Sequence, residues 1–141
     1  MKLEIAQKIV AAALANARTQ GFKPLAVAVL DARGALKAFA AEDGTSLRRA
    51  EIATGKAHGA LAMGLGSRTI GKMAAERPHF VAAVTHAVGG SLIPVPGGVL
   101  VRDGAGTVVG AVGVTGDTSD NDEAAAVAGI AAVGLKADPG A

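Results

Sequence analysis

The sequence contains no cysteine, no tryptophan and no tyrosine, and its only aromatic residues are three phenylalanines. Without cysteine there can be no disulfide, no thiolate metal site and no cysteine nucleophile. The apolar residues, 50% of the composition, are therefore mainly Ala, Val, Ile and Leu. In a single domain over residues 1–141, such an excess predicts exposed apolar surface at an oligomer interface or a ligand groove. We therefore expect a homo-oligomer, and a groove for a small-molecule ligand is the alternative use of such a surface.

The sequence also lacks the features of membrane and nucleic-acid partners. No apolar run reaches the roughly 18 residues that span a bilayer, since charged residues or glycines interrupt each run. The net charge is only +2, and no aromatic residues lie between the basic ones to stack on bases. Ala15-Asn16-Ala17 resembles a signal-peptide cleavage site and leaves secretion open. Because Glu4 and Lys8 interrupt the start, we favour a first helix and a cytoplasmic protein.

The pattern of apolar and turn residues predicts a mixed fold. Helices are expected over residues 3–20, 47–63, a short stretch from Ser67, 79–88 and 120–135. Strands are expected over residues 25–30, 35–41, 92–95, 98–103 and 108–115, and residues 136–141 are expected to be frayed. Consecutive hairpins favour a mostly antiparallel sheet of about five strands packed with helices, which is an α/β fold of the α+β type.

Two turns share the pattern Asp-x-x-Gly, at Asp31 to Gly34 and at Asp103 to Gly106. In each, the aspartate can accept backbone hydrogen bonds from the turn, and the glycine supplies the positive φ that a short hairpin needs. The acidic stretch 117–123 has Ser119 followed three residues later by an aspartate, much like a capping box. We interpret this stretch as the structural start of the last helix.

Several short pieces occur in an order that is more specific than any one of them. Gly55-Lys56-Ala57, Glu76-Arg77-Pro78 and Pro96-Gly97-Gly98 follow one another between the first and last helices. In this order the chain resembles, over nearly its whole length, the GlcG/HbpS-like family, also called the haem-degrading or DUF336 domain. The resemblance implies a profilin-like α/β sandwich, assembly into homo-oligomers and, as in some members, haem or tetrapyrrole binding.

Because cysteine and tyrosine are absent, the candidate ligands for haem iron are His58, His79, His86 and the methionines Met63 and Met73. His79 and His86 lie seven residues apart on one expected helix, roughly 10 Å along its axis, so they cannot chelate one ion together. His58 is our first choice as an axial ligand because it adjoins the matched Lys56-Ala57. The family often has an aromatic residue at this position, so His58 is a departure from its pattern.

The remaining candidate site residues are two cations and two glycines. Lys56 and Arg49 could pair with ligand carboxylates such as the propionates of haem. Gly97 and Gly98 would let a ligand approach the backbone closely.

Three functions stay open at this point. The first is a small-ligand-binding protein, most specifically for haem or another tetrapyrrole. The second is an enzyme of a catabolic, glycolate-type pathway in which Lys56, Arg49 and His58 bind and protonate a small organic acid. The third is an oligomeric assembly module without a small ligand. A closed pocket lined by His58 and a cation would favour the first, and a filled core there would favour the third.

Overall fold

Five antiparallel strands form the centre of the computed structural model, which describes residues 1–141. The strand order across the sheet is β2-β1-β4-β3-β5. Their bounds are β1 (Ala26–Asp31), β2 (Leu36–Ala41), β3 (Gly98–Arg102), β4 (Val108–Thr115) and β5 (Lys136–Asp138). The expected five-stranded antiparallel α/β fold is therefore confirmed.

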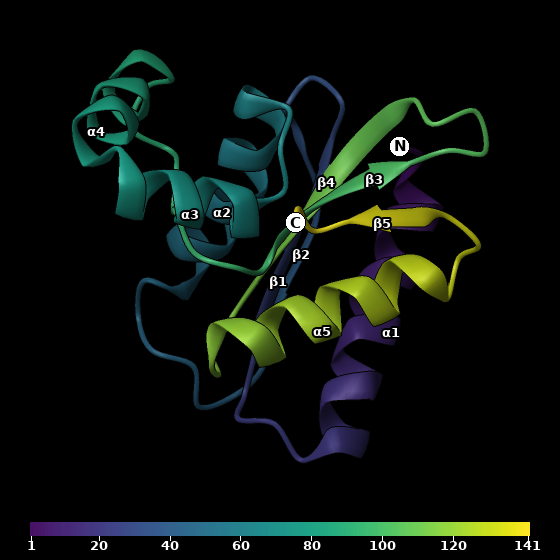
Figure 1. The fold of residues 1–141 in the computed structure, drawn as a ribbon. Coiled ribbons are helices and arrows are strands. Elements are labelled where there is room, and N and C mark those ends of the chain that lie inside the picture. The colour runs from purple at the N-terminus through teal and green to yellow at the C-terminus, as the bar shows by residue number, and fades with distance from the viewer.

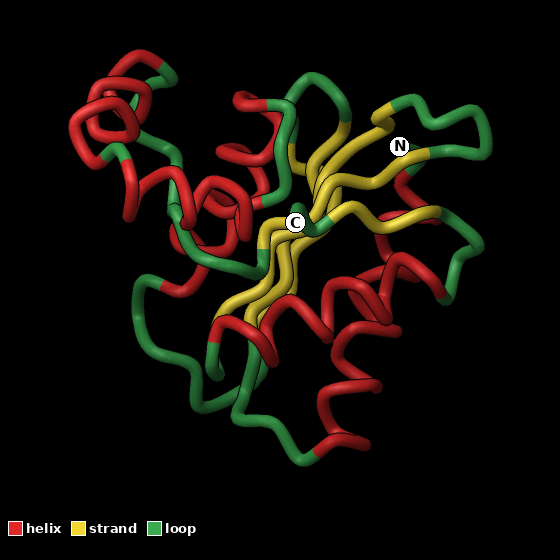
Figure 2. The backbone as a smooth tube through the Cα atoms, in the orientation of Figure 1, coloured by secondary structure: helices red, strands yellow, loops and turns green.

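Helices cover both faces of the sheet (Figure 1). The helices α1 (Leu3–Gln20) and α5 (Ser119–Ala131) lie on one face, and α2 (Arg49–Met63) lies on the other. The helices α3 (Ser67–Glu76) and α4 (Pro78–Ala87) form a hairpin outside α2. Figure 2 shows the strands between these two groups of helices. None of the helices is long and apolar enough to cross a membrane.

Alternation along the strands explains how one sheet supports two helical layers. Successive side chains of a strand point to opposite faces, so Val27 and Val29 of β1 face α1 and α5, whereas Leu30 faces α2. On the α2 side the sheet carries glycines. A Cβ added at Gly113 would collide with the carbonyl oxygen of Ala53, so α2 lies directly on the sheet backbone.

Both Asp-x-x-Gly turns form as the sequence predicts. Gly34 has φ +84° and Gly106 has φ +85°, a region that favours glycine. Asp31 and Asp103 each accept two backbone N–H groups from their own turn at 2.9–3.0 Å. These bonds fix the two hairpins β1–β2 and β3–β4.

The strand expected over residues 92–95 is wrong, because residues 88–97 form neither helix nor strand. Pro94 and Pro96 have no N–H to donate to a neighbouring strand. Leu92, which is only 3% exposed, packs instead against Ile70 and Val81 in a small core under the α3–α4 hairpin.

The fifth strand lies in residues that were expected to be frayed. β5 pairs antiparallel with β3, and the Arg102 guanidinium lies 2.8 Å from the carboxylate of Asp138. Three residues with one apolar side chain give no strand pattern in the sequence, so this strand depends on contacts with a distant segment.

Candidate functional site

Lys56 and His58, the two candidates closest in sequence, lie on opposite sides of α2. Residues two apart on a helix are separated by about 200° around its axis and do not face each other. Lys56 is 2% exposed and reaches toward α5. His58 is half-buried and faces Ser91, in the segment before β3. The expected site is therefore divided between two sides of one helix.

Lys56 belongs to a buried ion pair that anchors α2 to α5. Its Nζ donates to Oδ2 of Asp122 and to the carbonyl oxygen of Val114, both at 2.9 Å. Both charged side chains are 2% exposed. Burial lowers the pKa of Lys56 and raises the pKa of Asp122, and the attraction between the two charges opposes both shifts. Each charge keeps the other from being buried alone.

The capping pattern proposed for the acidic stretch is wrong in its details. The N-cap of α5 is Thr118 rather than Ser119, and the Thr118 Oγ1 accepts a hydrogen bond from the N–H of Asn121 at 3.2 Å. The carboxylate of Asp122 accepts the N–H of Asp117 through Oδ1 and pairs with the buried lysine through Oδ2. The stretch is structural, as expected, but one of its members lies in the core.

Gly97, Gly98 and Arg49 lie on the Lys56 side of α2. A Cβ at Gly97 would be 2.9 Å from Lys56 Nζ, and one at Gly98 would collide with the Lys56 carbonyl oxygen. Arg49 donates to the hydroxyl of Thr115 at 2.8 Å. Protein atoms fill the space beside both glycines. That Gly97, Gly98 and Lys56 contact a ligand therefore stays a prediction that no feature of the structure supports.

The ring of His58 is held through one nitrogen only. Nδ1 lies 2.7 Å from the carbonyl oxygen of Ser91. Because a carbonyl oxygen can only accept, Nδ1 carries the proton, and Nε2 of the neutral ring keeps a free lone pair. No hydrogen bond involves Nε2, and no buried side-chain nitrogen or oxygen lacks a partner. Nε2 is therefore not completely enclosed by protein atoms.

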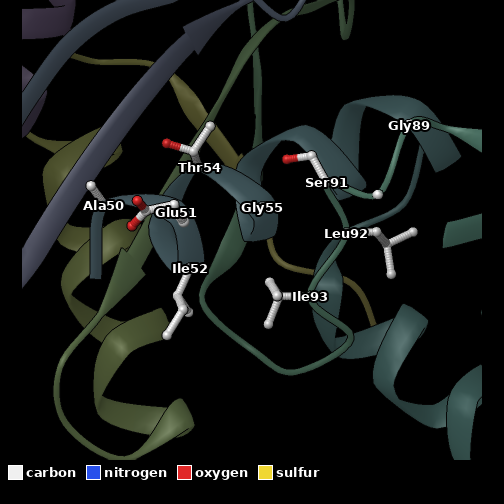
Figure 3. Close-up of a pocket in the computed structure, with 10 residues that line it drawn as sticks. Ala50, Glu51, Ile52, Thr54, Gly55, Gly89, Ser91, Leu92 and Ile93 are labelled. Carbon is white, nitrogen blue, oxygen red and sulfur yellow. The ribbon is translucent and has the colours of Figure 1, made fainter. Parts of the chain in front are cut away.

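An open groove of about 560 Å³ lies between α2 and residues 89–93 (Figure 3). We call it the α2 groove. Its lining residues are Ala50, Glu51, Ile52, Thr54, Gly55, Gly89, Gly90, Ser91, Leu92 and Ile93. In Figure 3, Ile52 and Ile93 lie in the lower part of the view and the hydroxyls of Thr54 and Ser91 in the upper part.

The charge of the groove differs from the expectation. Glu51 is the only charged residue of the lining, and no cation lines the groove. His58 does not belong to the lining either; it contacts the groove wall only through the hydrogen bond to the carbonyl oxygen of Ser91, and its Cδ2 lies 3.5 Å from where a Cβ of Gly34 would be.

Sequence reasoning missed the wall formed by residues 89–93, because part of it was assigned to a strand. The signal that could have identified it is the glycine pair Gly55 and Gly59 on α2. These residues are four apart, so they share one face of the helix and allow another segment to lie against it.

Known proteins resemble this chain over most of its length, both in sequence and in fold. The sequence matches the family described as haem degrading protein HbpS-like over residues 1–131. No curated protein matches the sequence.

Three solved structures illustrate the likeness. PduOC, solved as a complex with haem, is 21% identical, with a TM-score of 0.84 over 96% of this chain and 96% of that chain. The Klebsiella pneumoniae DUF336 protein ORFY is 24% identical, with a TM-score of 0.84 over 95% of this chain and 90% of that chain. A double mutant of Streptomyces reticuli HbpS is 29% identical, with a TM-score of 0.79 over 93% of this chain and 85% of that chain. The chain belongs to the HbpS-like family of haem-degrading proteins.

Proposed function

We propose that this protein binds haem in the α2 groove, with His58 as an axial ligand of the iron. The observation that carries the proposal is the state of the His58 ring, which has one nitrogen fixed on the carbonyl oxygen of Ser91, a residue of the groove wall, and the other nitrogen without a hydrogen bond. Membership of the HbpS-like family and the fold shared with PduOC, which was solved with haem bound, support it.

The donor atoms of the chain suit haem better than a bare metal ion. No group of three or more His, Cys, Asp or Glu side chains could hold an ion. Haem iron needs only an axial ligand or two from the protein, and a single histidine is a common choice. A metal-ligating histidine usually donates its other N–H to an oxygen, as His58 does to Ser91. When bound, haem would supply redox and oxygen chemistry.

The lining of the α2 groove suits the apolar part of a porphyrin. Ile52, Leu92 and Ile93 supply apolar contact, which is the main component of most cofactor sites. Glu51 carries the same sign of charge as haem propionates, and the lining has no cation to pair with them. The charges therefore favour a bound haem with its propionates toward solvent.

Haem titration with three histidine variants tests the proposal. The wild type should give a saturable Soret shift, and His58→Ala should alter that spectrum. His79→Ala and His86→Ala are matched controls, because both histidines are exposed on α4. Identical spectra for the wild type and all three variants would reject histidine ligation, and no spectral change with the wild type would reject haem binding.

A second probe separates the groove from the iron ligand. Metal-free protoporphyrin has no iron to ligate, so His58→Ala should bind it as the wild type does. Ile93→Asp places a charge in the lining and should weaken the binding of both haem and protoporphyrin. Unchanged binding of both probes to Ile93→Asp would place the porphyrin elsewhere on the protein.

No observation favours the organic-acid enzyme, which needs Lys56, Arg49 and His58 at one substrate. Lys56 and His58 lie on opposite sides of α2, and the ammonium group of Lys56 is already paired. The closed pocket lined by His58 and a cation is not found, because the α2 groove is open and its lining contains neither. The filled core that would favour the assembly module is not found either, since the open groove lies beside Ser91, the hydrogen-bond partner of His58.

A further inference from the structure

We propose that Gly59 is a positioning residue for His58. Because Gly59 has no side chain, the segment with Ser91 can lie close to α2, and the Ser91 carbonyl oxygen accepts the hydrogen bond of the imidazole. This contact determines which ring nitrogen carries the proton and which one is free. This inference rests on the proposed function only in treating His58 as the iron ligand. The state of the ring itself can be measured without haem.

The contact that holds His58 comes from a segment without regular structure. Residues 88–97 form neither helix nor strand, so no ladder of backbone hydrogen bonds fixes the position of Ser91. The neighbouring Leu92 provides that fixation. It is 3% exposed and packs against Ile70 and Val81 of the α3–α4 hairpin on one side, and against α2 on the other.

The contact with α2 is as close as a glycine permits. A Cβ added at Gly59 would lie 2.9 Å from Cγ, 3.2 Å from Cα and 3.3 Å from Cβ of Leu92. A methyl group there would press on the backbone of the segment, which a side-chain rotation cannot relieve. Ser91 is the residue before Leu92, so displacement of this backbone moves the carbonyl oxygen that accepts the hydrogen bond of His58.

Gly55 offers a matched control one helical turn earlier. A Cβ added at Gly55 would lie 2.7 Å from Cγ1 and 3.5 Å from Cδ1 of Ile93, which are flexible side-chain atoms, while the nearest backbone atom, the Leu92 nitrogen, is 3.8 Å away. Both Gly→Ala changes lie on the same helix and gain the same helix propensity. Only Gly59→Ala is expected to move the segment.

The ring of His58 reports the difference. In ¹⁵N-labelled protein without haem, at a pH where the imidazole is neutral, two-bond ¹H–¹⁵N spectra distinguish a protonated ring nitrogen from an unprotonated one. We expect protonated Nδ1 in the wild type and in Gly55→Ala. In Gly59→Ala the tautomer ratio should shift roughly fivefold toward Nε2–H, which is the size expected for loss of one net hydrogen bond. His58→Gln identifies the signals, and the exposed His79 and His86 provide internal references.

Leu92→Ala gives a second route if Gly59→Ala does not fold. It releases the segment from the α3–α4 hairpin and should shift the tautomer ratio in the same direction. An unchanged ratio in both folded variants would overturn the inference, and so would a wild-type ring protonated on Nε2. If the ratio shifts as expected but the wild type binds no haem, the positioning role stands and the proposed function fails.

Discussion

The buried pair of Lys56 and Asp122 makes a prediction about stability whose pH dependence has a defined sign. Its members are 2% exposed and 2.9 Å apart. Removing one partner of such a pair leaves a buried charge without compensation, which typically costs about 3–5 kcal/mol. We therefore expect Lys56→Met and Asp122→Asn each to lower the free energy of unfolding by about 3 kcal/mol or more at pH 7.

The two variants should respond to pH in opposite directions. In Lys56→Met, burial still raises the pKa of Asp122 above its ordinary 3.8, and the lysine no longer opposes this rise. The folded variant then holds a proton that the unfolded chain has released. Its stability is greatest at low pH and falls as pH rises through the folded pKa. The stability gap to the wild type should therefore widen from pH 4 to pH 7, by up to about 1.4 kcal/mol per pH unit.

Asp122→Asn leaves Lys56 as the uncompensated charge. Burial lowers the pKa of Lys56 below its ordinary 10.5, and the attraction that opposes this shift is lost. The unfolded chain now binds the extra proton, so stability rises with pH through the folded pKa of the lysine. The difference in free energy of unfolding between Asp122→Asn and the wild type should therefore become smaller at alkaline pH. The same difference for Lys56→Met should not.

Urea denaturation followed by far-ultraviolet circular dichroism is the suitable assay, because the chain has no Trp or Tyr for intrinsic fluorescence. Lys8→Met is the control, since the Lys8–Glu4 pair is 61% and 75% exposed, and solvent screening leaves such a pair little effect on stability. Stability gaps that follow pH with the same sign in both variants, or gaps no larger than that of Lys8→Met, would refute the reasoning.

Two further predictions concern the turns and the surface. Gly34→Ala and Gly106→Ala should each destabilise the fold by about 1 kcal/mol or more, because both glycines have positive φ. Gly104→Ala is the control, because φ is not positive there and an added Cβ meets nothing within 4 Å. Melting curves of the two variants that resemble the curve of this control would contradict the prediction. We also propose a homo-oligomer, since Leu36 is 56% and Leu47 is 89% exposed; light scattering at micromolar concentration should give a mass above that of one chain, and a monomer would contradict it.

Local signals in the sequence were enough for the elements whose causes are local. The first helix has the expected bounds because its apolar stripe ends at Gly21, which takes a left-handed conformation. The two hairpins follow from aspartates that bond within their own turns. β5 was missed because its pairing depends on Arg102, which lies 36 residues before its partner Asp138.

The division of the candidate site could have been predicted in part from helix geometry. Lys56 and His58 were grouped because they are neighbours in sequence, but an interval of two residues places them on opposite sides of a helix. The partner of Lys56 is 66 residues away in sequence, and no local pattern indicates it. A hint was present, since Lys56 lies among Ala53, Ala57 and Ala60, where a long cation in contact with a core needs a buried counter-charge.

The helix α2 therefore has two roles on two faces. On the side of Lys56, glycines of the sheet let the helix lie on the backbone, and the ion pair ties it to α5. On the side of His58, the glycines belong to the helix itself, and the irregular segment lies on them with its carbonyl oxygen on the imidazole. Because the ammonium and the imidazole share a helix but no contact, stability and ring chemistry can be varied separately. A change in the haem spectrum can then be assigned to the ligand rather than to a loss of fold.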